Sequence, residues 1–317
     1  MDQHLQVRLD EARAAIAGPA AASFRDVSLE VTGEAAGLAS HFPVAETGVA
    51  CVGAALIAAA ALHRDRGGAA LPVSLDRGHV GVALRSEAWF RRGGRPAPAG
   101  FAPLSRFWET ADGWVRTHAN YPWHRGALLR AIGAPEDPEA VGTALAGMAA
   151  EEVEASVIAA GGVAAAVRAL GDWRAHPQGR ALATEPLVAR GEIGEARNRE
   201  RAPADLPAAG VRVLDLTRVI AGPVCTRYLA ALGADVVRID PPRRPDMGRG
   251  AVADTLLGKA SAVVDLSSRS GLATLHALAD QADVVVLGYR PAALARFGLG
   301  PEDLAGRHPG LVVVSLD

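Results

Sequence analysis

The chain has 317 residues, of which 50% are hydrophobic and only 4% aromatic. A large core built mainly from small aliphatic side chains is therefore expected. The formal net charge is -2 and Lys259 is the only lysine. Because nucleic-acid binders carry clustered basic surface, the scattered arginines argue against that class of partner. The two cysteines, Cys51 and Cys225, lie in no metal-ligand spacing. We therefore expect neither a disulfide framework nor a bound metal.

The N-terminal segment and the most apolar segment bear on location. Residues 1–18 are charged and lack the apolar stretch of a secretory signal. The most apolar run, residues 49–62, has about 14 residues, whereas a membrane-spanning helix needs roughly 20. We therefore expect an Ala-rich helix buried in protein, no membrane partner and a cytoplasmic location.

The chain divides into regions of different texture. Residues 1–197 have mostly helical patterns and predict a helical α+β region. Residues 198–210 are charged, contain prolines and lack periodicity, which is typical of a linker. Residues 211–317 alternate short β-branched runs with helical segments. This alternation predicts an α/β fold, with a doubly wound, parallel, Rossmann-like sheet in the C-terminal half.

In chain order, the first region is expected to hold helices over 2–16, 46–64, 151–160 and 163–170, an extended segment over 71–78, and a hairpin over 107–118 that turns at Asp112-Gly113. The second region is expected to hold strands over 211–216, 235–239, 262–266, 283–287 and 311–316, with helices over 222–232, 268–280 and 291–297.

The first strand of the second region leads into a turn that suits an anion. The turn reads TRVIAGP, and Pro223 stands in the first turn of the helix that follows. Free backbone N–H groups at such a helix start can bind phosphate. Neither the dinucleotide fingerprint GxGxxG nor a P-loop is present, so a nicotinamide, flavin or nucleotide site is not indicated. A plain strand-to-helix turn is the alternative.

Four segments together resemble the family III CoA-transferases (CaiB/BaiF; the formyl-CoA and carnitine-CoA transferase type). They are VRVLDLTRVIAGPVCTRYLAALGADVVRIDPP, LLGKASAVVDL, DVVVLGYRPAALARFGLG and PEDLAGRHPGLVVVSLD, and they follow the order of that family. The resemblance implies a CoA-binding domain that takes coenzyme A as a substrate, with no permanently bound cofactor.

The resemblance also implies which residues contact CoA: Val219, Ile220, Leu257, Lys259, Tyr289, Arg290 and Arg296. The chemistry agrees, since arginine forks bind phosphate, lysine supplies a point charge and tyrosine stacks on adenine. Ordinary surface charges at Lys259 and Arg296, and a core role for Tyr289, are the alternatives. Ala260 stands where the family has arginine, and Leu287-Gly288 replaces its Glu-Asn, so two polar positions are lost.

The first region is similar to the later half of the same family, here placed before the earlier half. The similarity rests on ETGVACVGAALIAAAALHRDRGGAALPVSL, PLSRFWETADGWV and AAGGVAAAVRALGDWRAHPQG. The chain thus resembles a permuted or tandem arrangement, either truncated at Asp317 or completed by a partner. By the same resemblance, an interlocked homodimer is the expected assembly.

The family uses an aspartate as its nucleophile, and the resemblance places the corresponding acid at Glu46. A helix N-terminus keeps such a carboxylate ionised and able to attack an acyl-CoA thioester. Glu46 is one methylene longer than aspartate. The alternative is that it only complements the helix dipole.

Three functions stay open at this stage. The first is transfer of CoA between an acyl-CoA and a carboxylic acid. The second is an acyl-CoA racemase or isomerase of the same fold, which exchanges an α-proton through a histidine such as His41, His118 or His124. The third is a non-catalytic CoA-binding subunit.

Overall fold

The computed structural model describes residues 3–18, 24, 26–34, 38, 40–96, 100–195, 201–246 and 253–316. By packing, the chain forms two compact units, one of residues 1–97 with 187–317 and the other of residues 98–186. The 198–210 segment expected as a linker falls inside the first unit. The division of the chain by sequence texture stays a prediction.

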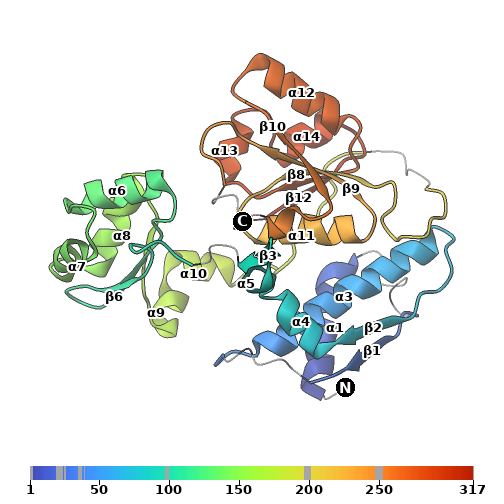
Figure 1. Cartoon of the computed structure of the whole chain (residues 1–317), viewed down its shortest axis with the longest axis horizontal. Helices are drawn as coiled ribbons and strands as arrows, with labels where there is room; N and C mark the ends of the chain where they lie inside the picture. Colours follow the sequence, from blue (N-terminus) through green and yellow to red (C-terminus); the bar gives the residue numbers. More distant parts are fainter. Residues whose placement is uncertain are drawn as a thin grey trace. The chain divides into compact units, whose positions relative to one another are not determined.

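The C-terminal part of the first unit is a five-stranded, all-parallel sheet in the order β10-β9-β8-β11-β12 (Figure 1). From β8 the chain adds β9 and then β10 on one side of the sheet. It then returns to add β11 and β12 on the other side. The doubly wound α/β fold expected from the sequence is confirmed. The strands are β8 (Arg212–Leu216), β9 (Asp235–Asp240), β10 (Lys259–Val263), β11 (Val284–Leu287) and β12 (Val312–Ser315).

Helices cover both faces of this sheet, and each face has its own core. On one face α11 (Ala221–Ala231) packs over Val213, Val236 and Val286. On the other face Leu275 of α12 and Leu304 of α14 pack with the remaining inward side chains of the strands (Figure 1). Burial on both faces explains why the strands read as nearly continuous apolar runs. The helices on the second face are α12 (Arg269–Ala279), α13 (Pro291–Ala295) and α14 (Pro301–Arg307), and the short η2 (Asp254–Leu256) precedes β10.

The N-terminal part of the first unit is mostly helical. Its core joins Leu5 and Leu9 with Val49, Ile57 and Leu75. A short pair of parallel strands, β1 and β2, lies in register from Leu29↔Val73 to Thr32↔Asp76. The elements are α1 (Gln3–Ala17), β1 (Leu29–Thr32), α3 (Val44–Asp65), β2 (Val73–Asp76), α4 (Arg77–Ala83), α5 (Ser86–Trp89), β3 (Arg91–Arg92) and β4 (Arg95–Pro96).

Helix α3 is longer than its most apolar run. It has 22 residues, and it is the one helix in the described part of the chain that is long and apolar enough to cross a membrane. Half of its most apolar 18-residue window is buried. The buried side includes Val49, Ala54 and Ile57, which pack on α1 and β2. Such contacts are those of a core helix.

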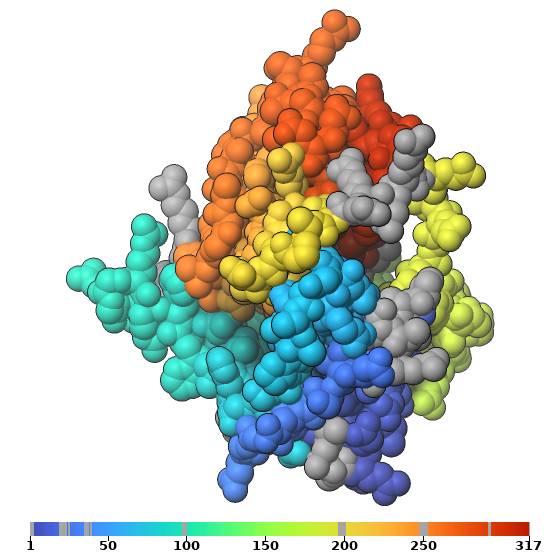
Figure 2. Space-filling model, turned by 90° about the vertical axis from the view of Figure 1, so that its right-hand side faces the viewer, coloured from blue at the N-terminus to red at the C-terminus, as the bar shows by residue number. Residues whose placement is uncertain are grey.

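Hydrogen bonds tie the two parts of the first unit together. Arg66, just after α3, donates to the carbonyl oxygens of Pro207 (2.8 Å) and Ala202 (3.0 Å). In Figure 2 the carboxyl end of α3, in light blue, accordingly lies beside the yellow 201–210 segment. At another point Asp254 accepts a hydrogen bond from Ser86 Oγ at 2.6 Å.

The second unit confirms the expected hairpin and corrects one expected helix. Strands β5 (Phe107–Glu109) and β6 (Trp114–Thr117) pair antiparallel around the Asp112-Gly113 turn. The helix expected over 163–170 is wrong, because Ala164–Ala166 forms β7 and pairs with β6. Gly161 adopts a φ of +83°, which ends α8 and turns the chain back as a strand. The helices are α6 (Pro122–Ile132), α7 (Pro138–Ala146), α8 (Ala150–Ala159), α9 (Leu170–Ala175) and α10 (Pro177–Leu182).

Candidate CoA-binding site

The carboxyl ends of β8 and β11 define the place where a ligand would bind. These strands are neighbours, with Leu216 paired to Leu287, and the chain leaves them in opposite directions across the sheet. Such a switch point is where open α/β sheets hold their ligands. It brings together the turn after β8 and the turn after β11. The Arg218 guanidinium accordingly lies 5.7 Å from the centroid of the Tyr289 ring.

Two glycines let the backbones meet at this switch point. A Cβ on Gly222 would lie 2.4 Å from the Cβ of Thr217, and one on Gly288 would lie 3.0 Å from it. Thr217 itself is fully buried. The Leu287-Gly288 pair, which departs from the Glu-Asn of the resembling family, is thus explained in part by the need for close approach.

The turn between β8 and α11 presents apolar side chains to solvent. Val219 is 39% exposed and Ile220 is 60% exposed. Val219 has a φ of +68°, a left-handed conformation that costs a β-branched residue free energy. Its N–H donates to Asp246 Oδ2 at 3.0 Å. Helix α11, which follows, has no side-chain cap, so the turn offers apolar contact next to backbone donors.

A buried arginine that sequence reasoning missed supports this turn. Arg238 on β9 is 1% exposed and donates to Asp240 (2.8 and 2.9 Å) and to Asp246 (2.9 Å). Burial opposes its charge, but the hydrogen bonds that it donates to the two carboxylates raise the pKa of Arg238 overall. Asp246 therefore links Arg238 to the Val219 backbone. The signal in the sequence is one charged residue inside the apolar run DVVRID.

Tyr289 lies half-buried at the same edge of the sheet, packed against the core under α12 and α14. Burial raises the pKa of its hydroxyl. Arg290, the next residue, is exposed. Arg296 is also exposed, and its guanidinium lies 4.5 Å from the ring centroid of Phe297. Of the expected CoA residues, the structure thus brings Val219, Ile220 and Tyr289 to one edge.

Lys259 is held inside the protein. Its Nζ donates to Asp215 Oδ2 (2.9 Å), the Pro223 carbonyl (2.8 Å) and Thr226 Oγ1 (2.6 Å). Both side chains of the Lys259–Asp215 pair are fully buried. All three N–H bonds of the ammonium therefore have partners within the chain. Lys259 on β10 thus forms hydrogen bonds with both β8 and α11. Direct contact with a ligand would require one of these bonds to break.

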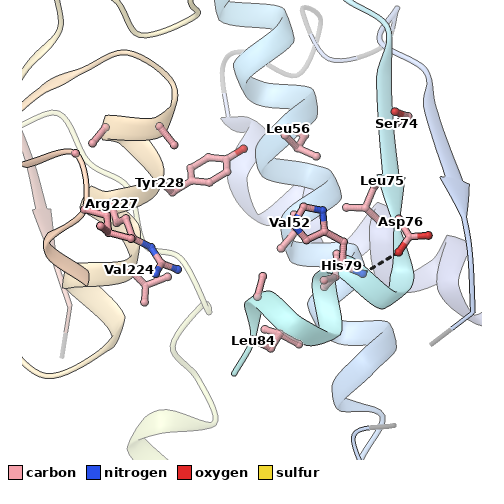
Figure 3. A pocket seen from close by; sticks show the side chains of 16 residues that line it. Val52, Leu56, Ser74, Leu75, Asp76, His79, Leu84, Val224, Arg227 and Tyr228 are labelled. Carbon is pink, nitrogen blue, oxygen red and sulfur yellow. Dashed lines mark hydrogen bonds between the residues drawn. The ribbon is translucent and has the colours of Figure 1, made fainter. Parts of the chain in front are cut away.

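An apolar cavity of about 810 Å³ lies beside α11 (Figure 3). Leu257, which is 55% exposed and one of the expected CoA residues, forms part of its wall. The Tyr228 hydroxyl points across the cavity toward Leu56 (Figure 3). The other apolar lining residues come from α3, β2, α4 with its C-cap Leu84, and α11, and include Val52, Leu75, Val80, Ala83, Leu84, Val224, Ala230 and Ala231.

Glu46, the expected nucleophile, lies in the first turn of α3 and is half-buried. It is not among the residues that line the cavity. Its place at a helix start agrees with the sequence expectation, and its role stays a prediction.

The histidines considered for proton exchange belong to two different units. His41 is exposed in the first unit. His118 and His124 belong to the second unit, where their ring centroids are 6.0 Å apart and both contact Tyr121. Burial and the Arg116 charge lower the pKa of His118. Across the described ranges, no three His, Cys, Asp or Glu side chains are grouped to hold a metal ion.

Comparison with known proteins agrees with this geometry. Residues 208–317, which contain the whole parallel sheet, match the model of CoA-transferase family III. Residues 208–317 are thus similar to CoA-transferase family III, and they are called the family III segment below. It contains the switch point, the Val219 turn and the Lys259–Asp215 pair.

Several relatives of the family III segment carry CoA-transferase names. An acyl-CoA transferase of Gibberella moniliformis is 30% identical over 62% of this chain and 37% of its own length. A formyl-CoA:oxalate CoA-transferase of Afipia carboxidovorans is 36% identical over 34% of this chain and 28% of its own length. The crystal structure of Rv3272 from Mycobacterium tuberculosis is 36% identical, with a TM-score of 0.32, over 35% of this chain and 33% of that one. The chain thus spans about a third of the length of these relatives.

Proposed function

We propose that the chain takes part in moving CoA between an acyl-CoA and a carboxylic acid, and that it binds CoA at the carboxyl edge of its parallel sheet. The observation that supports this most is the coincidence of the family III segment with a switch point whose turn exposes Val219 and Ile220. These two side chains offer apolar contact for pantetheine, while the exposed Arg290 and Arg296 offer guanidinium groups for phosphates.

The transfer would run through Glu46. Its carboxylate oxygen bonds to the thioester carbonyl carbon, the carbon–sulfur bond breaks, and CoA leaves as a thiolate. The thiolate then attacks the Glu46 carbonyl carbon of the mixed anhydride and releases the first acid as a carboxylate. An acceptor carboxylate attacks the carbonyl carbon of the resulting Glu46 thioester, which releases CoA thiolate and leaves a mixed anhydride of Glu46 and the acceptor. The thiolate then attacks the acceptor carbonyl carbon, so the acceptor leaves as its CoA thioester and the Glu46 carboxylate is regenerated. The helix N-terminus at Glu46 favours the ionised form that the first step needs.

Calorimetric titration with CoA tests the binding site. Ile220→Ser removes an exposed apolar side chain, so the fold should be kept while CoA affinity falls by roughly tenfold. Leu187→Ser is the matched control, because Leu187 is 93% exposed and belongs to no part of the candidate site. No CoA binding by the native chain, or equal affinities for all three proteins, would contradict the proposed site.

A trapping experiment tests the chemistry. Acyl-CoA is added with hydroxylamine, and peptides are searched by mass spectrometry for a hydroxamate at Glu46. Its presence in the native chain and absence in Glu46→Gln supports transfer. Deuterium uptake at the substrate α-carbon without such an adduct supports the racemase alternative instead.

A non-catalytic CoA-binding role is the second candidate, and one observation favours it. Asp76 is the one carboxylate that lines the cavity, and it is engaged in capping α4 through the His79 N–H at 2.8 Å. CoA binding with neither adduct nor exchange would support this role. The cytoplasmic location and the interlocked homodimer stay predictions, and light scattering on the purified chain tests the second.

A further inference from the structure

We propose that the apolar cavity beside α11 holds the acyl chain of the thioester substrate, so that the chain selects medium or long aliphatic acyl groups. This proposal rests on the proposed function and names its substrate class.

The position of the cavity connects it to the candidate CoA site. Leu257 and Gly258 form part of its wall, directly before Lys259. Val224 forms another part, one helical turn after Ile220. An acyl group attached to CoA at the Val219 turn therefore has an apolar space next to it along α11.

The size and lining of the cavity fit an alkyl chain. Its volume of about 810 Å³ lies within the roughly 300–1,000 Å³ of small-molecule pockets. A formyl or acetyl group would leave most of this space empty. The walls come from separate elements, with Val52 and Leu56 on α3 and Ala230 and Ala231 on α11. Water in such a space gains few hydrogen bonds, so an aliphatic chain is the favoured occupant.

Arg227 and Asp76, which line the cavity, already have partners within the chain. Arg227 forms an ion pair with Asp254 at 2.7 Å and also donates to Ser86 Oγ at 3.3 Å. Asp76 caps α4. Neither side chain therefore requires a charged ligand. The acyl group of a thioester is uncharged, so it suits this cavity.

One polar atom in the cavity lacks a partner. The buried Tyr228 hydroxyl has no hydrogen-bond partner among the described residues, although buried polar groups are nearly always satisfied. Desolvation raises the pKa of Tyr228 to about 12, so the hydroxyl stays protonated and can donate. An oxygen brought by the ligand, or a water that enters with it, would satisfy this donor.

Calorimetric titration with CoA and with acetyl-, butyryl-, hexanoyl-, octanoyl- and decanoyl-CoA tests the proposal. Each added methylene that enters the cavity should tighten binding by roughly fourfold until the space is filled. Titration with CoA alone tests the proposed CoA site independently of the acyl pocket. Binding of CoA with equal affinity for acetyl- and octanoyl-CoA would overturn the acyl pocket and leave the CoA site standing. No binding of CoA would overturn both.

Substitutions that fill the cavity provide a second test of the proposal. Ala83 on α4 and Ala231 on α11 both line the cavity and are exposed, so Ala83→Phe and Ala231→Phe each add a ring that has room to occupy the cavity. Either change should abolish the gain from chain length and leave CoA affinity unchanged. Val82→Phe is the matched control, since Val82 is an exposed neighbour of Ala83 that does not line the cavity. If the chain-length gain persists in both folded filling variants, the acyl chain binds elsewhere.

Discussion

Lys259, the first residue of β10, and Asp215, the fourth residue of β8, form a fully buried ion pair with Nζ and Oδ2 2.9 Å apart. Desolvation by burial lowers the pKa of Lys259, and the Asp215 charge opposes that effect. The aspartate also accepts hydrogen bonds from Thr217 and Thr226. The pair is therefore the polar centre of the βα unit that begins the family III segment.

Removing the lysine should destabilise the protein severely. Lys259→Met leaves the Asp215 carboxylate buried without its cation, which costs about 3–5 kcal/mol. The free energy of unfolding in urea measures this. Adding Asp215→Asn to Lys259→Met should recover part of the loss, because the neutral amide oxygen can still accept from Thr226. A Lys259→Met protein as stable as the native chain would show that the ion pair contributes nothing to the free energy of unfolding.

A methyl group at Gly288 should force the switch point apart. Its Cβ would lie 3.0 Å from the Thr217 Cβ and 3.3 Å from the Thr217 Cα, so Gly288→Ala is expected to cost about 1–3 kcal/mol. Gly306→Ala is the control, because Gly306 lies exposed within α14 with nothing within 4 Å of an added Cβ. It should gain up to about 1 kcal/mol. Chemical denaturation of both variants distinguishes crowding from a general glycine effect.

Relief of backbone strain should stabilise the turn at the candidate CoA site. Val219 has a φ of +68°, so Val219→Gly is expected to raise the free energy of unfolding by about 1 kcal/mol. The same change removes an exposed apolar contact and should weaken CoA binding. Ile220→Gly is the control, because Ile220 has a φ of -124° and gains nothing from glycine. A Val219→Gly variant that loses stability would refute the strained conformation.

The buried pair His276 and His308 should make stability depend on pH. Arg307 can only donate to His276 Nε2 (3.0 Å), so His276 Nδ1–H donates to His308 Nε2 (3.0 Å). His308 Nδ1–H then donates to Asp280 at 2.7 Å. This chain of bonds favours the neutral form of His276, because an added proton on its Nε2 would meet the Arg307 donor.

The direction of the pH dependence of stability follows from the pKa of His276 in the folded state. Burial, and then the Arg307 charge, lower it below the ordinary value of 6.5. The unfolded state therefore binds the proton more tightly, so the contribution to stability is complete above about pH 6.5. It is lost as the pH falls from there through the folded pKa. The Tm of the native chain should therefore fall more between pH 7.5 and pH 5.5 than the Tm of His276→Gln. Equal declines would exclude His276 as the source.

Much of the sheet could be predicted from the sequence, because strands buried on both faces leave β-branched runs such as DVVVL. The boundaries of β10 could not. It begins at Lys259 rather than at Ala262, because the lysine side chain is neutralised by Asp215, which lies 44 positions earlier in the chain. The strand at Ala164–Ala166 was missed for a similar reason, since three alanines favour a helix until β6 lies beside them.

The candidate site was predicted unevenly. The Val219 turn and Tyr289 meet at the switch point because strand order alone brings them together. The supporting role of Arg238 and the cavity between α3 and α11 depend on contacts between distant segments. No local pattern contains that information. Lys259 was identified as a functional position, yet its three partners within the chain give it a structural role that the motif alone could not reveal.

The central place of β8 has a consequence for how the chain is made. Its partner β11 comes much later, since Arg212 and Asp283, which are joined by a hydrogen bond, are 71 positions apart. On the ribosome, β9 can pair with one edge of β8 early, while the other edge waits on the order of ten seconds at ~5–20 residues per second. An open apolar strand edge is a template for wrong pairing. Yield of native protein should therefore respond to growth temperature and chaperone supply more than equilibrium stability alone would indicate.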